Sequence, residues 1–318
     1  MSKLIKLEKL KSGFLKDVVV VIGFFDGVHI GHKKIIRLCV EKAKKIKGTS
    51  VVFTFDKPPL NILKRGMHKK LITSYAGKIK LIKELGVDFI VAAKFDSTFS
   101  KIEPEQFCRE ILIDKLNIKD LFIGEDFKFG NSASGDTNFL RNFFRSRDVN
   151  VNIIPILRIE GIPVTSTTIR KFYNKGRVEK IITFLGRLPS ITGIVLHGDG
   201  RGKALGFPTA NIDVFEEFVT PNDGVYLGYV NILDKKFKNV QLPSVMNIGS
   251  NPTFKGKRKW IESHIINFNE EIYGCNIKVS FLKKLRDEIS FQNKEELVNQ
   301  IKKDKVFAKN YDFNNIVT

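Results

Sequence analysis

Apolar residues in the first half of the chain form short runs that alternate with stretches of helical spacing. The run at 18–24 is rich in valine and too uniformly apolar for a half-exposed strand, which is typical of a parallel strand covered on both faces. Further strands are predicted at 50–55, 88–95, 120–124 and 151–157. Helices are predicted at 35–46, around 78–85, at 104–116 and at 138–146. The alternation predicts an α/β domain with a doubly wound parallel sheet, whose ligands bind beyond the carboxyl ends of the strands.

The pattern changes near residue 187, where 187–190 is typical of a linker. Short strands separated by turns rich in Gly, Asn, Asp and Pro follow at 191–198, 224–233, 240–249, 260–268 and 276–285. This pattern predicts a small antiparallel β-barrel, followed by a final helix at 294–310. A length of 318 residues fits two domains, which we expect at 1–186 and 187–318.

The composition, with 42% hydrophobic and 28% charged residues, is that of a globular protein with sizeable cores. No apolar run of about 18 residues and no secretory pattern is present, so we expect no membrane association and a cytoplasmic location. The cysteines Cys39, Cys108 and Cys275 show no CxxC spacing, which argues against a zinc knuckle or a disulfide framework. Each is expected to lie in a core.

The net charge of +20 comes from 54 Lys and Arg residues against 34 Asp and Glu residues. Such a surplus favours polyanionic ligands, which include nucleotides, RNA and DNA. The lysines are spread through every predicted helix, however, as expected for solvated faces. We therefore do not expect nucleic-acid binding from charge alone, and the sequence does not indicate an oligomeric state.

The segment 23–32, GFFDGVHIGH, joins the first buried strand to a helix. Glycines allow a phosphate to approach the backbone, and the helix N-terminus favours its charge. His29 and His32 add donors that can stabilise charge on an α-phosphate as pyrophosphate leaves. A structural histidine is the alternative, but the position after the strand favours an ATP-phosphate site. Its candidate ATP-binding residues are Gly23, Phe24, Asp26 and Gly31.

Two later segments are expected at the same edge of the sheet. In 124–130, GEDFKFG, glycines bracket an acidic turn in which Asp126 and Phe127 could reach metal, ribose or substrate; an ordinary strand-to-helix turn is the alternative. In 165–170, TSTTIR, hydroxyl residues begin a helix. They can cap it or, with a forked arginine donor, hold a phosphate, and the candidates are Ser166, Thr167 and Arg170.

A second candidate site lies in 198–211, GDGRGKALGFPTAN. Its glycines predict a mobile loop whose basic residues could cover phosphates, with Gly198, Gly202 and Lys203 as candidates. Pro208 then begins a turn that presents Thr209 and Asn211. Their hydroxyl and amide oxygens are hard ligands suited to Mg²⁺ held jointly with ATP phosphates. The alternative is a glycine-rich hairpin with a proline corner.

Glu262 lies in the middle of a predicted strand, on the same face as Trp260 and His264. A carboxylate directed into a barrel mouth is unfavourable unless paired, so Glu262 is a candidate general base for a substrate hydroxyl. The alternative is a surface residue, and for His264 a structural role is favoured.

Nine ordered segments resemble the bifunctional riboflavin kinase/FAD synthetase family of prokaryotes across essentially the whole chain. They are GFFDGVHIGH, VVFTF, GEDFKFG, TSTTIR, GDGRGKALGFPTANI, PNDGVY, MNIGSNPTF, WIESHI and FLKKLRDE. The resemblance implies an N-terminal FMN adenylyltransferase with a Rossmann-like nucleotidyltransferase fold. It also implies a C-terminal riboflavin kinase built as a six-stranded barrel. ATP and Mg²⁺ would serve both steps, from riboflavin to FMN and then to FAD.

The resemblance also implies roles for the candidate residues. His29 and His32 would contact ATP phosphates, and Asp126 would lie in the substrate loop. The phosphate end would be held by Ser166, Thr167 and Arg170. In the kinase, Thr209 and Asn211 would bind Mg-ATP, the loop from Gly198 to Lys203 would close over ATP, and Glu262 would deprotonate the ribityl 5′-hydroxyl.

The chain departs from the family at three positions. Pro58 stands where a histidine is usual, Phe24 replaces a polar residue, and Lys128 stands where arginine is common. The first two favour, as an alternative, a riboflavin kinase with a degenerate N-terminal flavin- or nucleotide-binding module. A third hypothesis, an RNA-binding protein or RNA-acting adenylyltransferase, is motivated by the charge and by basic and aromatic residues at 171–173.

Overall fold

Two units of structure make up the chain, residues Met1–Ser166 and Thr167–Thr318. The computed structural model describes residues 2–58, 69–198, 200, 202, 205–214, 218–237, 240–253 and 256–313. Lys203, a candidate for the phosphate loop, lies outside the described residues. Among the described residues, no helix combines the length and the apolar character needed to cross a membrane.

The first unit is built on a six-stranded sheet in which every neighbouring pair is parallel. Its strands are β1 (Lys3–Lys6), β2 (Val18–Ile22), β3 (Thr49–Phe55), β4 (Phe89–Ala93), β5 (Ile118–Gly124) and β8 (Asn150–Ile154). Their order across the sheet is β1-β4-β3-β2-β5-β8. The parallel sheet and its five predicted strands are confirmed. The edge strand β1 was not predicted.

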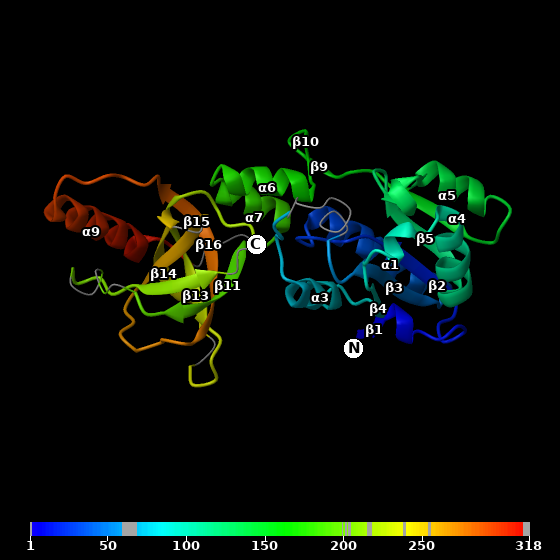
Figure 1. Ribbon diagram of the computed structural model, residues 1–318, viewed down its shortest axis with the longest axis horizontal. Helices are drawn as coiled ribbons and strands as arrows, with labels where there is room; N and C mark the ends of the chain where they lie inside the picture. Colours follow the sequence, from blue (N-terminus) through cyan, green and yellow to red (C-terminus); the bar gives the residue numbers. More distant parts are fainter. Residues whose placement is uncertain are drawn as a thin grey trace. The chain divides into compact units, whose positions relative to one another are not determined.

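Helices cover both faces of this sheet, as the ribbon from blue to green shows (Figure 1). Val18 and Val20 pack with the helices at 104–115 and 137–144. Val19 packs with the helices at 30–46 and 75–83 on the opposite face. The strand therefore has no exposed side, which is the physical reason for its continuous apolar sequence.

The predicted helices of the first unit are present, with one change of form. They are α1 (Ile30–Ile46), α3 (Tyr75–Lys83), α4 (Pro104–Gln106), its continuation as a π-helix η3 (Phe107–Lys115), and α5 (Thr137–Phe144). Shorter elements are η1 (Leu7–Lys9), η2 (Phe99–Lys101), η4 (Asn131–Ala133), β6 (Lys128–Phe129), β7 (Gly135–Asp136), β9 (Arg158–Ile159) and β10 (Ile162–Pro163). Cys39 and Cys108 are buried in the hydrophobic cores on the two faces of the sheet, as expected, while Cys275 in the second unit is half-buried.

The second unit contains a closed antiparallel barrel, which confirms the predicted class. Around it the strands run β11-β12-β15-β14-β13-β16. Their bounds are β11 (Ser190–Leu196), β12 (Ala210–Val214), β13 (Gly224–Ile232), β14 (Leu242–Thr253), β15 (Gly256–Ile265) and β16 (Asn276–Arg286). Five of them match strands expected from the pattern. The remaining strand, β12, makes the sixth that the family resemblance implied.

In the part of the second unit that the structure describes, the barrel is accompanied by the helices α6 (Ser166–Asn174), α7 (Val178–Leu185) and α9 (Lys294–Asn310). Val178 of α7 belongs to the barrel core, and α9 coincides with the predicted final helix. Figure 1 shows α9 beside the barrel strands, where Arg286 forms an ion pair with Asp304 at 2.8 Å. By their contacts α7 and most of α6 group with the barrel, although they precede the linker that the sequence predicts at 187.

Candidate active sites

The turn between β2 and α1 places two histidine rings together. His29 is the N-cap of α1, and its Nδ1 accepts a hydrogen bond from the backbone N–H of His32 at 3.2 Å. The two rings stack with centroids 3.5 Å apart. Since Nδ1 is an acceptor, the proton of the neutral His29 ring lies on Nε2. The helix start thus fixes one imidazole as a directed donor.

The close packing of this turn depends on its glycines. Phe25 and Val28 have positive φ angles of 56° and 39°, which are uncommon for such residues. A Cβ at Gly23 would come within 2.8 Å of the Phe25 ring, and one at Gly31 within 3.2 Å of His29 Nδ1. A side chain at Gly31 would therefore push the His29 ring out of position.

Asp26 braces the turn from inside. Its carboxylate, 5% exposed, accepts hydrogen bonds from the backbone N–H groups of Ile72 and Thr73 at 3.0 and 3.3 Å. Its carbonyl oxygen accepts one from the Ser166 hydroxyl at 2.9 Å. The structure thus brings Ser166 to the histidine turn. The Asp26 carboxylate is hydrogen-bonded to the backbone of the segment that contains Ile72 and Thr73. Of the other two candidates in that segment, Thr167 is exposed and Arg170, one turn further along α6, is half-buried.

The acidic turn after β5 leaves the same edge of the sheet as the histidine turn, because β5 and β2 are parallel neighbours. Asp126 is exposed, and Phe127 stacks on Phe129 with ring centroids 5.5 Å apart. The expected grouping of these two turns at one edge is therefore observed.

A buried lysine that the sequence analysis did not select also reaches this turn. Lys78 of α3 is 2% exposed, and its Nζ donates to the carbonyl oxygen of Phe24 at 3.0 Å. Phe24, one of the departures from the family, presents its ring to the same ammonium group at 4.2 Å. The signal in the sequence was the position of Lys78 one helical turn before Ile82 and next to Ile79, both apolar, whereas a lysine in a helix is ordinarily assigned to the surface.

In the barrel, Glu262 lies in a row of polar residues across three neighbouring strands. It pairs with Asn211 of β12 on one side and with Asn247 of β14 on the other. Residues directly opposite on neighbouring strands project from the same face. Asn247 was not among the predicted candidates, although it lies in one of the family segments.

The row faces away from the barrel core, because Ile261 is fully buried on the other face of β15. Glu262 is exposed. The cost of burying its carboxylate, which suggested a special role, therefore does not apply. What supports a functional role instead is its position between the side chains of Asn211 and Asn247.

The glycine loop lies directly on the oxygen-bearing residues of the second candidate site. A Cβ at Gly198 would fall 1.9 Å from Asn211 Nδ2, and one at Gly202 would fall 2.9 Å from Thr209 Oγ1. Only glycine fits at these two positions without displacing the neighbour. The structure thus brings together four of the predicted residues: Gly198, Gly202, Thr209 and Asn211.

His264 supports this turn from β15. Its Nδ1 lies 2.9 Å from the carbonyl oxygen of Pro208, and its ring packs edge-on to Phe207. Burial lowers the pKa of His264, which favours the neutral ring with Nδ1 as donor. The structural role favoured from the sequence is therefore consistent with the contacts that His264 makes.

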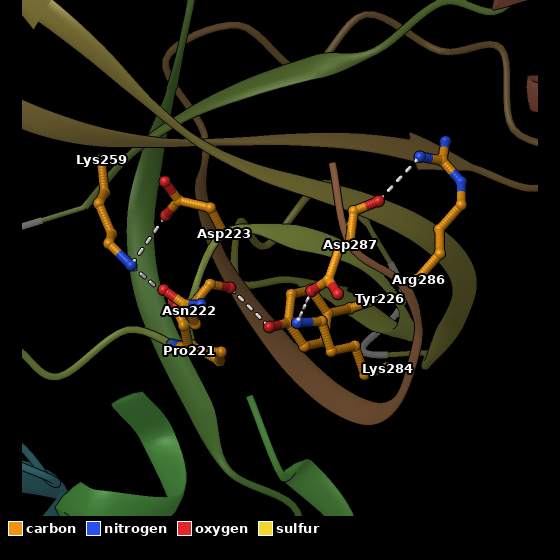
Figure 2. Close-up of polar contacts among 8 residues, drawn as sticks. All are labelled: Pro221, Asn222, Asp223, Tyr226, Lys259, Lys284, Arg286 and Asp287. Atoms are coloured by element: carbon orange, nitrogen blue, oxygen red, sulfur yellow. Dashed lines mark hydrogen bonds and ion pairs between the residues drawn. The ribbon is translucent and has the colours of Figure 1, made fainter. Parts of the chain in front are cut away.

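A network of polar contacts fixes the turn before β13, in the segment PNDGVY (Figure 2). Lys259 contacts the Pro221 carbonyl oxygen at 2.9 Å and the Asp223 carboxylate at 3.0 Å. The Tyr226 hydroxyl donates to the carbonyl oxygen of Asn222, and burial raises the pKa of this phenol. The turn is thus held from two strands of the barrel.

The donor set of Thr209 and Asn211 is suited to a magnesium ion, since a hydroxyl and an amide oxygen are both hard oxygen ligands. Within the described ranges, no group of three or more His, Cys, Asp or Glu side chains could hold a metal. Thr209 and Asn211 alone would leave most coordination positions of such an ion to other ligands.

Comparison with known proteins assigns a family to each unit. A family model described as FAD synthetase matches residues 11–168, and one described as riboflavin kinase matches residues 185–312. A solved structure described as a macrolide-efflux protein from Streptococcus pneumoniae has a TM-score of 0.87 and 30% identity, covering 97% of this chain and 99% of that chain.

Curated relatives match along nearly their whole length, and each is described as a bifunctional riboflavin kinase/FMN adenylyltransferase. The protein of Buchnera aphidicola subsp. Schizaphis graminum is 37% identical over 308 residues, 96% of each chain. That of Bacillus subtilis is 34% identical over 317 residues, 98% of this chain and 96% of the relative. That of Escherichia coli K12 is 31% identical over 310 residues, 97% of each chain. With both units matched in the same order, the chain belongs to the family of bifunctional riboflavin kinase/FMN adenylyltransferases.

Proposed function

We propose that this chain phosphorylates riboflavin to FMN in the barrel unit and adenylylates FMN to FAD in the parallel-sheet unit. The proposal is supported by the presence in each unit of a glycine-containing turn that could hold phosphates. One is the turn that ends in His29, and the other is the glycine loop lying on Thr209 and Asn211. We assign the two activities to residues 1–186 and 187–318, and place both in the cytoplasm because both consume ATP.

In the adenylyl transfer, a phosphate oxygen of FMN attacks the α-phosphate of ATP and pyrophosphate leaves. His29 Nε2, His32 and the N-terminus of α1 would stabilise the charge that develops on the phosphate oxygens. The supporting roles that we propose are binding of ATP by Gly23, Phe24, Asp26, Gly31, Ser166, Thr167 and Arg170, and contact with substrate by Asp126 and Phe127. Asp26 would act through the backbone that it braces.

In the kinase reaction, the Glu262 carboxylate takes the proton of the ribityl 5′-hydroxyl, and the hydroxyl oxygen attacks the γ-phosphate of ATP as ADP leaves. An exposed carboxylate suits this role, since the proton can pass on to solvent. Gly198, Gly202, Lys203 and Pro208 would form the wall over the phosphates. Mg²⁺ held by Thr209 and Asn211 would offset the phosphate charge.

The test is a two-substrate assay on the full-length protein with ATP and Mg²⁺. Riboflavin is expected to yield FMN with one ADP for each FMN, and supplied FMN to yield FAD with one pyrophosphate for each FAD. FMN without any FAD after long incubation would instead establish the kinase-only alternative. RNA binding that is sensitive to salt and resists displacement by FMN and ATP would favour the third hypothesis.

Replacement of Gly198 by alanine is expected to lower the rate of FMN formation by about 10²-fold, the order expected when reacting groups are displaced by about 1 Å. The new methyl group would overlap the Asn211 amide, which would have to move. FAD formation from FMN by the same protein serves as the internal control. An unchanged rate of FMN formation would contradict the proposed contact between the loop and the magnesium ligand.

A further inference from the structure

Lys78 is buried in the first unit with its ammonium group fully hydrogen-bonded. Its Nζ donates to the carbonyl oxygens of Phe24 at 3.0 Å and Phe55 at 2.8 Å, and to the hydroxyl of Thr54 at 3.2 Å. The ammonium group has three N–H bonds, so these contacts match its donor capacity. The Thr54 hydroxyl also donates to the Phe24 carbonyl oxygen, at 3.2 Å.

All of these acceptors lie at the edge of the sheet where the histidine turn begins. Phe24 is in the turn that follows β2, whereas Thr54 and Phe55 end the neighbouring strand β3. Lys78 therefore ties the start of the turn to the end of the adjacent strand. The turn needs such a restraint, because Phe25 and Val28 occupy positive φ angles before the chain reaches His29.

The ammonium group is held here by dipoles and aromatic rings. No described residue forms an ion pair with Lys78, and the rings of Phe24 and Tyr75 lie 4.2 and 5.4 Å from its Nζ. Burial lowers the pKa of Lys78 to about 8, and the nearby charges of Asp26 and Asp56 oppose this shift. A buried charge of this kind opposes folding and is kept where a site requires it.

We propose that Lys78 is a positioning residue for adenylyl transfer. It fixes the Phe24 carbonyl group and thereby the position in which the turn presents His29 to the α-phosphate. The inference rests on the proposed FAD synthesis in this unit. Lys78 acts through the turn, so its loss should reduce turnover more than substrate affinity.

The decisive variant is Lys78→Met, which keeps the length of the side chain and removes the ammonium group. In the full-length protein, kcat for FAD formation from FMN is expected to fall about 10²-fold, with KM for ATP and FMN nearly unchanged. The midpoint of thermal unfolding should stay close to that of the wild type, since the Phe24 carbonyl keeps the Thr54 hydroxyl and a buried charge is lost. Riboflavin phosphorylation should be unaffected.

Lys80→Met is the matched control, because Lys80 is an exposed lysine of the same helix. A folded Lys78→Met protein that makes FAD as fast as this control would overturn the proposal, and so would a rise in KM with unchanged kcat. Should Lys78→Met not fold, Thr54→Val decides: it removes one acceptor, and an unchanged kcat for FAD formation would again overturn it. Absence of FAD with the wild-type protein would instead contradict the proposed function.

Discussion

Replacing Glu262 by glutamine is expected to lower the rate of FMN formation from riboflavin by about 10²- to 10⁴-fold, the usual contribution of a general base. Glutamine has nearly the same shape as glutamate but cannot take the proton of the 5′-hydroxyl. The side chain is exposed, so the variant should fold as the wild type does. The measurement is the initial rate of FMN formation at saturating riboflavin and ATP.

The same protein provides an internal control, because FAD formation from supplied FMN should remain at the wild-type rate. Glu271→Gln is a matched control for the loss of one exposed carboxylate in the barrel unit. Equal loss of FMN and FAD formation in Glu262→Gln would contradict the assignment of the two reactions to separate sites. Wild-type FMN formation would remove Glu262 from the mechanism.

Replacing His32 by alanine is expected to have the opposite pattern, with FAD formation lowered by about 10²- to 10³-fold and FMN formation retained. Two effects contribute. The His32 ring is lost as a donor to the phosphates, and the His29 ring loses the stacking partner that lies 3.5 Å away. The backbone N–H of residue 32 still donates to His29 Nδ1, so His29 still caps α1 and the start of the helix should persist.

Lys44→Ala, an exposed residue near the other end of α1, controls for changes in the helix and its charge. Circular dichroism should show equal helix content in both variants. If His32→Ala forms FAD at the rate of Lys44→Ala, the histidine turn is not the adenylyl-transfer site, whatever the kinase activity of the protein.

The order of elements could be predicted because most of the strands are buried on one or both faces, which leaves a strong apolar pattern. The one strand of the parallel sheet and the one strand of the barrel that were missed lack this pattern. In β1, Lys3 and Lys6 flank only two apolar residues, and the strand lies at the edge of its sheet with little buried surface. In β12, the alternation is limited to Ile212 and Val214, next to a motif that was interpreted as a turn.

The candidate sites show a similar division. Motifs that are contiguous in the chain, such as the pair His29 and His32, could be located because the helix start brings them together. Contacts between distant segments could not. The sequence gives no sign that Asn247 flanks Glu262, since only the strand register sets that pairing. Nor could it show that Lys78 folds inward, because the acceptors that make its burial tolerable come from two other segments.

Closure of the barrel has a consequence for the order in which the protein matures during synthesis. The first and last strands of the barrel, β11 and β16, pair with each other, so the ring is incomplete until Arg286 has left the ribosome. The parallel sheet needs nothing beyond Ile154. Since domains fold largely as units from the N-terminus onward, the half that makes FAD should fold first on the nascent chain, before the half that supplies its FMN.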